Sequence, residues 1–187
     1  YLSEEGKRAL LHQIEALGSR TANILLEYIR DKDIDVLIAE NTNAMPMTLI
    51  GGMAVYKLAV EQRIAAVFHH HDFWWERSRF SHNHIEQLLS RIMPPTDPGV
   101  EHIVLSSYAA HILSSLKRVQ PLVVPNCEDF DHVIVKDDYN GDLKTELGFR
   151  EDDFLIVQPT RIVRRKHIED SVRLVGKLIR TYPDLSD

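Results

Sequence analysis

Short apolar runs alternate with longer segments of helical spacing along this chain, and this alternation strongly limits the folds it can adopt. Runs rich in β-branched and other apolar residues predict buried strands at residues 33–39, 64–68, 102–105, 121–124 and 154–157. Apolar residues at helical spacing predict helices at 47–62, 82–92, 107–116, 140–147 and 166–182. Residues 2–30 are expected to form one long helix or a pair of helices, with Gly18 as the point where the helix can break or bend. This order predicts an α/β fold with a Rossmann-like, doubly wound parallel sheet that carries helices on both faces.

The composition is that of an ordinary globular protein, with 44% hydrophobic and 27% charged residues and a formal net charge of −6. The negative charge argues against nucleic acid as a partner. Cys127 is the one cysteine, so the sequence offers no intrachain disulfide and favours a reducing, cytoplasmic compartment. No apolar run approaches the roughly 18–20 residues that span a bilayer. Association with a membrane surface and the oligomeric state are left open.

Polar or charged clusters follow three of the predicted strands, at residues 40–43, 69–77 and 161–166. Ligands of open α/β sheets bind at the carboxyl ends of the strands, so these clusters predict a binding or catalytic site. In the first cluster, Glu40 and Asn41 can bind hydroxyl groups of an acceptor. Capping of the helix that follows is the alternative role.

The second cluster is a histidine run followed by Asp72 and two tryptophans. Successive side chains of a strand alternate between faces, so at most His69 and His71 point to one side, with a carboxylate from Asp72 or Glu76 nearby. His82 and His84 are spaced poorly for one helix face, and no HExxH or Cys/His pairing occurs, so no metal site is predicted. His71 and Asp72 are candidate catalytic residues, and the alternative is a packed loop.

The tryptophans of this cluster can stack on sugar rings or fill the core. We expect one of Trp74 and Trp75 to lie in the core and the other to face a ligand. Trp74 is the candidate acceptor-binding residue of the two.

The third cluster is a basic turn with Arg161, Arg164, Arg165 and Lys166 at the start of a predicted helix. Cations at a helix N-terminus oppose the macrodipole at a cost of about 0.3–1 kcal/mol each, so a bound anion would explain the cluster. The alternative is a solvated helix start. The residues beyond 154 comprise one predicted strand and one predicted helix, which cannot bury a core alone. The sequence therefore predicts a unit over 1–150 and a truncated second unit over 151–187.

Four segments in order resemble the retaining glycosyltransferases of family 4 (group 1, GT-B fold). They are FLIVQPTRIVRRKHIEDSVRLVGKL at 154–178, VVPNCEDFD at 123–131, IVLSSYAAHIL at 103–113 and FHHHDFWWE at 68–76. The first is similar to the opening of that family's second domain, where a Lys follows an Arg by five residues, as Lys166 follows Arg161. Thr160 and His167 stand where the family usually has Gly. The family's upstream Gly-rich loop and downstream acidic pair are absent from this sequence, so we expect an internal piece of a longer enzyme, inactive alone.

The resemblance implies that residues 1–150 form most of an acceptor-side domain and 151–187 the start of a donor-side domain. It implies sugar transfer from a nucleotide-diphosphate sugar to an acceptor with retention of anomeric configuration, and neither a cofactor nor a tightly bound metal. Arg161 and Lys166 would hold the donor diphosphate, and His71 would lie near the reacting sugar. The acceptor would be a sugar, a sugar phosphate or a glycerate-type acid. Alternatives are a GT-B-like sugar-nucleotide epimerase or phosphorylase, and a non-catalytic anion-binding α/β module.

Overall fold

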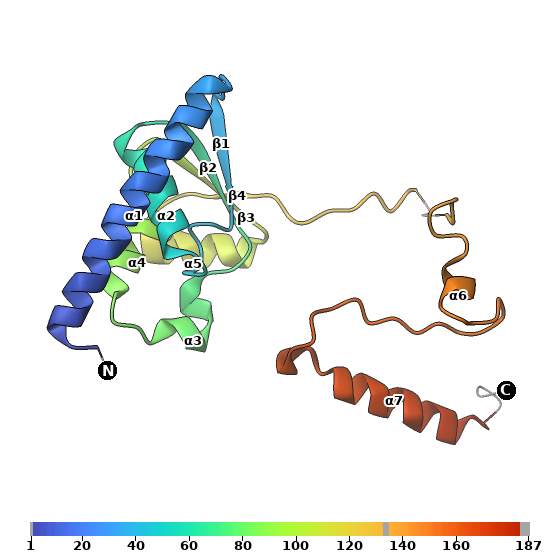
Figure 1. The fold of residues 1–187 in the computed structure, drawn as a ribbon. Helices are drawn as coiled ribbons and strands as arrows, with labels where there is room; N and C mark the ends of the chain where they lie inside the picture. Colours follow the sequence, from blue (N-terminus) through green and yellow to red (C-terminus); the bar gives the residue numbers. More distant parts are fainter. Residues whose placement is uncertain (1, 133–134, 184–187) are drawn as a thin grey trace. The chain divides into compact units, whose positions relative to one another are not determined.

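The computed structural model describes residues 2–132 and 135–183 (Figure 1). The chain divides into two compact units, Tyr1–Glu128 and Asp129–Asp187, which are described separately below. The sequence-based boundary at residue 150 stays a prediction. Within the described residues, no helix combines the length and apolarity that crossing a membrane requires.

Unit 1 is built on a four-stranded parallel sheet flanked by helices. Its strands are β1 (Val36–Glu40), β2 (Ala65–His70), β3 (Val100–Val104) and β4 (Leu122–Val123), in the spatial order β1-β2-β3-β4. The predicted α/β fold with a parallel sheet is therefore confirmed. The strands follow one another in sequence order, and in the described residues the helices pack on one face of the sheet instead of the two that were predicted. The strands begin and end one to three residues away from their predicted bounds, and β2 includes His69 and His70, which were expected beyond its end.

Unit 1 contains five α-helices in its described residues, and three of them begin at capping side chains. They are α1 (Glu4–Asp31), α2 (Leu49–Tyr56) with a π-helical continuation (Lys57–Glu61), α3 (Ser78–Ser81), α4 (Glu86–Ile92) and α5 (Ser107–Lys117). The hydroxyls of Ser3, Thr48 and Ser106 accept hydrogen bonds from the first turns of α1, α2 and α5.

Of the two alternatives for residues 2–30, the single long helix is confirmed, because α1 continues through Gly18 without a break. Gly18 is buried, and a Cβ built on it would lie 2.3 Å from Cγ of Met53 in α2. The glycine lets α1 approach α2 closely, and packing explains its presence where the sequence suggested a break.

One face of the sheet carries the core of unit 1. Ala39, Ala66 and Phe68 are buried against Val55 and Ala59 of the α2 segment. The next layer is α1, which packs on α2 through a cluster that consists of Ala22, Leu26, Ile29, Ala54 and Leu58 (Figure 1). Right-handed crossovers between consecutive neighbouring strands put their helices on one side of a sheet, which explains this layering.

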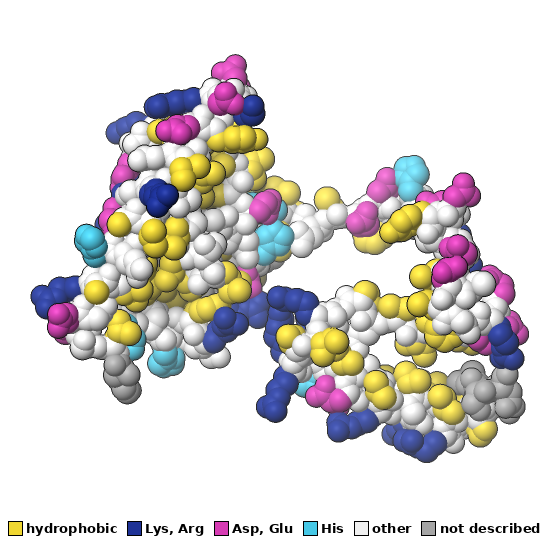
Figure 2. All heavy atoms as spheres, in the orientation of Figure 1, with side chains coloured by type: hydrophobic (Ala, Val, Ile, Leu, Met, Phe, Trp, Pro, Cys, Tyr) yellow, Lys and Arg dark blue, Asp and Glu magenta, His cyan; other side chains and the backbone are white. Residues whose placement is uncertain are grey.

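The opposite face of the sheet is exposed in the described part of the chain. The side chains of Val36, Ile38 and Leu122 are 50%, 64% and 63% exposed, respectively. Figure 2 shows hydrophobic side chains reaching the surface beside β1. Glu40 and His69 alternate onto this same face, so the candidate site described below lies on an open surface.

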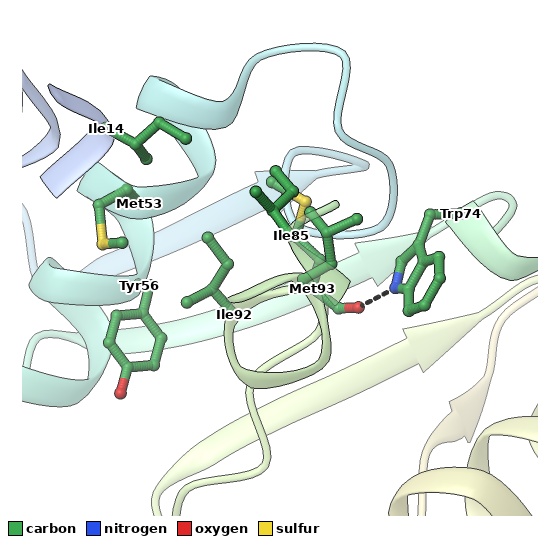
Figure 3. Close-up of a cluster of buried hydrophobic side chains, with 8 residues drawn as sticks. Ile14, Met53, Tyr56, Trp74, Ile85, Ile92 and Met93 are labelled. Carbon is green, nitrogen blue, oxygen red and sulfur yellow. Dashed lines mark hydrogen bonds between the residues drawn. The ribbon is translucent and has the colours of Figure 1, made fainter. Parts of the chain in front are cut away.

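A third core cluster joins α4 to α1 and α2 (Figure 3). It consists of Ile14, Met53, Tyr56, Trp74, Ile85, Leu89, Ile92 and Met93. The indole N–H of Trp74 donates a hydrogen bond to the Met93 carbonyl at 2.9 Å, which satisfies the polar edge of a buried ring.

Unit 2 contains α6 (Leu143–Glu146), a 3₁₀ turn at Arg164–Lys166 and α7 (Ile168–Thr181). The predicted strand at 154–157 is wrong: these residues are irregular, and Phe154 and Ile156 are 88% and 71% exposed. A strand needs a neighbour for its backbone hydrogen bonds, and the described residues of unit 2 contain no other strand. The last helix begins at Ile168, two residues later than predicted, because His167 adopts the left-handed conformation with a φ of 50°.

Candidate functional site

The candidate site begins with two residues that face each other across the β1–β2 pair. Glu40 and His69 are register partners at the carboxyl ends of these parallel strands. Their side chains therefore emerge on the same face of the sheet. The side chain of His71, two residues beyond His69, lies on the same face as Glu40 and His69, while His70 points into the core. The predicted alternation of the histidine run is confirmed.

Glu40 binds both histidines. Its Oε1 lies 2.8 Å from Nδ1 of His69, and its Oε2 lies 3.2 Å from Nε2 of His71. The two imidazole rings are 4.9 Å apart. The hydrogen bond from His69 is the main cause that lowers the pKa of Glu40; burial opposes it, and the hydrogen bond from His71 adds to the lowering. The cluster thus presents an ionised carboxylate between two imidazoles, and Glu40 and His71 remain 59% and 40% exposed.

Asn41 connects the two strand ends. Its backbone has a φ of 54°, a left-handed conformation that asparagine tolerates better than most residues. Its backbone N–H donates to the carbonyl of His69 at 2.8 Å, and its side-chain oxygen accepts the N–H of His71 at 3.0 Å. Its amide nitrogen donates to Oδ1 of Asp72 at 3.1 Å. Asn41 thereby fixes the backbone that carries His71.

Asp72 is occupied by structural partners. It accepts the hydrogen bond from Asn41 and two from the guanidinium of Arg77, one of them from Nε at 3.1 Å. This arrangement gives Asp72 a positioning role in the loop. Its predicted catalytic role stays a prediction, as does that of His71, whose ring is accessible to a ligand.

Both tryptophans pack into unit 1. Trp74 is 7% exposed and belongs to the cluster of Figure 3, whereas the ring of Trp75 stacks on Phe73 at 4.5 Å between centroids. This burial favours a core role for Trp74. Both rings also line an open hollow of about 520 Å³ beside α4 and α5, with Glu86, Ser90 and Lys117 among its walls. The role of Trp74 in acceptor binding stays a prediction.

Sequence reasoning missed His69 as a site residue and expected the carboxylate to come from Asp72 or Glu76. Glu76 instead accepts the backbone N–H of Phe73 at 2.8 Å. The carboxylate comes from Glu40, 29 residues before His69. The signal that could have found this pair is the parallel pairing itself, since both residues end their strands at the same edge of the sheet.

The basic turn lies in unit 2 and is exposed. Arg164–Lys166 form a 3₁₀ turn before α7, and Gln158 donates its amide N–H to the Lys166 carbonyl at 2.9 Å. Figure 2 shows Lys and Arg side chains gathered where α7 begins. Among the described residues, neither Arg161 nor Lys166 forms an ion pair with an acidic group. The turn therefore presents accessible cations, as an anion site would.

Comparison with known proteins finds two relatives with the same activity. The chain is 34% identical over 157 residues to a mannosylglucosylglycerate synthase of Petrotoga mobilis, a match that covers 80% of this chain and 36% of that protein. It is 32% identical over 152 residues to a mannosylglucosylglycerate synthase of Thermotoga maritima, with 80% and 35% coverage. No family model and no solved structure matches the chain.

The chain thus spans about a third of the length of these relatives. Both are named as synthases of a compound with two sugar units and a glycerate unit, and both are glycosyltransferases by what they make. Four-fifths of this chain is similar to part of such enzymes.

Proposed function

We propose that the protein is a glycosyltransferase that moves a hexose from a nucleotide-diphosphate sugar to a hydroxyl of a small polar acceptor. The observation that carries this proposal is the similarity over 80% of the chain to two mannosylglucosylglycerate synthases. The polar cluster at the carboxyl ends of β1 and β2 agrees with it, because ligands of parallel sheets bind there. Retention of anomeric configuration and membership of family 4 are parts of the same proposal and rest on the four motifs of the sequence.

The acceptor side of the proposal uses Glu40, Asn41 and His71. The relatives' name contains glycerate, so we propose an acceptor with a glycerate moiety that carries one sugar or none. An ionised Glu40 accepts a hydrogen bond from an acceptor hydroxyl, and the accessible ring of His71 can donate to or accept from a neighbouring oxygen. Asn41 and Asp72 hold this geometry in place.

The donor side uses Arg161 and Lys166, whose spacing matches the family motif. A guanidinium and an ammonium form charge-assisted hydrogen bonds with phosphate oxygens. Their charge also stabilises the nucleoside diphosphate as it leaves, which lowers the barrier to transfer. Arg164 and Arg165 are expected at the solvated rim. The exposure of the turn and its lack of acidic partners among the described residues support this assignment.

Calorimetric titration with a panel of nucleoside diphosphate hexoses tests the donor assignment. The protein expressed from its complete gene should bind at least one of them. Arg161→Ala and Lys166→Ala should each weaken binding about 10-fold to 100-fold, because a hydrogen bond to a charged group contributes roughly 1.5–3 kcal/mol. Arg164→Ala and the more distant Lys177→Ala are matched controls that should change it less than about threefold.

Two results would contradict the donor assignment. One is the absence of binding by every nucleotide sugar. The other is binding that is unchanged in Arg161→Ala and Lys166→Ala. Binding of a donor with no transfer to any acceptor would instead favour the non-catalytic anion-binding module.

A further inference from the structure

Glu40, His69 and His71 offer three ligand atoms, one from each residue, that all lie within 4.8 Å of one another. We propose that these residues form a binding site for a divalent transition-metal ion of the zinc type. The sequence predicted no metal, because the third ligand comes from a different strand and cannot be recognised in the histidine run itself.

The distances suit a metal. Zinc binds imidazole nitrogen and carboxylate oxygen at about 2.0–2.2 Å, so tetrahedral ligand atoms lie roughly 3.3 Å apart. Oε1 of Glu40 lies 2.8 Å from Nδ1 of His69, and Oε2 of Glu40 lies 3.2 Å from Nε2 of His71. An ion can enter when side-chain rotations bring the three ligand atoms from within 4.8 Å of one another to the tetrahedral spacing, and it replaces the two protons that the imidazoles now share with Glu40.

The ligand types select the class of ion. Two imidazoles and one carboxylate suit Zn²⁺, Co²⁺, Ni²⁺ or Cu²⁺, whereas Mg²⁺ and Ca²⁺ prefer sets made only of oxygen. Three protein ligands leave a fourth tetrahedral position open. Because Glu40 and His71 are 59% and 40% exposed, that position can take water or an oxygen of a bound molecule.

The fold holds the ligands in place before the ion arrives. Glu40 and His69 lie at paired positions of two hydrogen-bonded strands, and Asn41 fixes the backbone N–H of His71. Asp72 holds the side chain of Asn41 from the other side. Such backbone support lowers the cost of ordering the ligands.

Titration with Co²⁺, which reports its coordination by visible absorption, tests the site in untagged protein without substrate. We expect saturable binding of one ion with absorption in the visible range, and its displacement by Zn²⁺. Glu40→Gln and His71→Ala should each weaken binding at least tenfold, because each removes a ligand. The matched control His111→Ala replaces an exposed histidine of α5 and should leave binding unchanged.

Urea denaturation of each variant checks that a lost signal reflects a lost ligand and not a lost fold. Equal Co²⁺ binding by wild-type protein, Glu40→Gln and His71→Ala would overturn the site and leave a hydrogen-bonded cluster. The absence of visible absorption at saturating Co²⁺ would also overturn the proposed metal site. Displacement of Co²⁺ by an equal amount of Mg²⁺ would overturn the assignment to transition metals. Since no nucleotide sugar is present, the result is independent of the donor titration.

Discussion

His69 and His70 are adjacent in β2 but lie in opposite environments. His69 faces the open side of the sheet and binds Glu40, whereas His70 is 1% exposed and contacts His102 of β3 at 3.0 Å between ring nitrogens. Burial lowers the pKa of His70 to about 3, and burial lowers that of His102 to about 4. The two buried rings are therefore neutral near pH 7, and only one face of the strand contributes to the candidate site.

This buried pair predicts a loss of stability in mild acid. The unfolded chain takes up protons on both histidines below about pH 6.5, while the folded chain does not until about pH 4 and pH 3. The free energy of unfolding should therefore fall as pH falls from about 6 to 4.5, by about 1.4 kcal/mol per pH unit for each histidine. Urea denaturation at several pH values between 7 and 4.5 measures this slope.

A variant at His102 tests whether the buried histidines cause the pH dependence of the free energy of unfolding. His102→Gln should reduce the pH dependence by about one proton, whereas His111→Gln, a change of an exposed histidine, should leave it unaltered. A free energy of unfolding that does not change between pH 7 and 5 would contradict the neutral buried pair. The carboxylate of Glu40 has a lowered pKa and loses its contribution only below about pH 4.5, outside most of this window.

At the scale of elements, the sheet was predictable because its strands are short apolar runs between helical segments. The run at 154–157 has the same composition and forms no strand, since pairing depends on a neighbour that local sequence does not specify. The contact between Glu40 and His69 likewise could not be predicted from the sequence, because it depends on the register of two strands. The sequence alone could predict that each polar cluster follows a strand, but it could not predict which side chains contact one another.

The two faces of the sheet give a prediction at this scale. Phe68 is fully buried and Ile38 is 64% exposed, on opposite faces of neighbouring strands. Phe68→Ala should lower the free energy of unfolding by about 3–5 kcal/mol, because it leaves a cavity in the core. Ile38→Ala, the matched control, should cost less than about 1 kcal/mol, because most of that side chain is already in water.

Chemical denaturation of both variants measures this difference. A cost for Ile38→Ala as large as that for Phe68→Ala would show that the open face is packed against something in the protein. The description of the Glu40 cluster as lying on an open surface would then be wrong.

At the scale of the whole molecule, the chain corresponds to about a third of the length of its relatives. Its first unit carries a cluster suited to hydroxyl groups, and its second unit carries a turn suited to a diphosphate. Both features are expected of a glycosyltransferase, and they lie on separate units of the chain. The proposed activity therefore depends on residues of both units and on the complete protein.

The most direct measurement is transfer of labelled hexose to glycerate or a glycosylglycerate by the protein expressed from its complete gene, followed by product analysis. We predict a glycosylated product with the donor's anomeric configuration. His71→Ala should reduce its rate of formation at least tenfold with donor binding unchanged, while His111→Ala should have no effect. Absence of a product with every nucleotide sugar of the panel and with both acceptor classes would contradict the proposed sugar transfer.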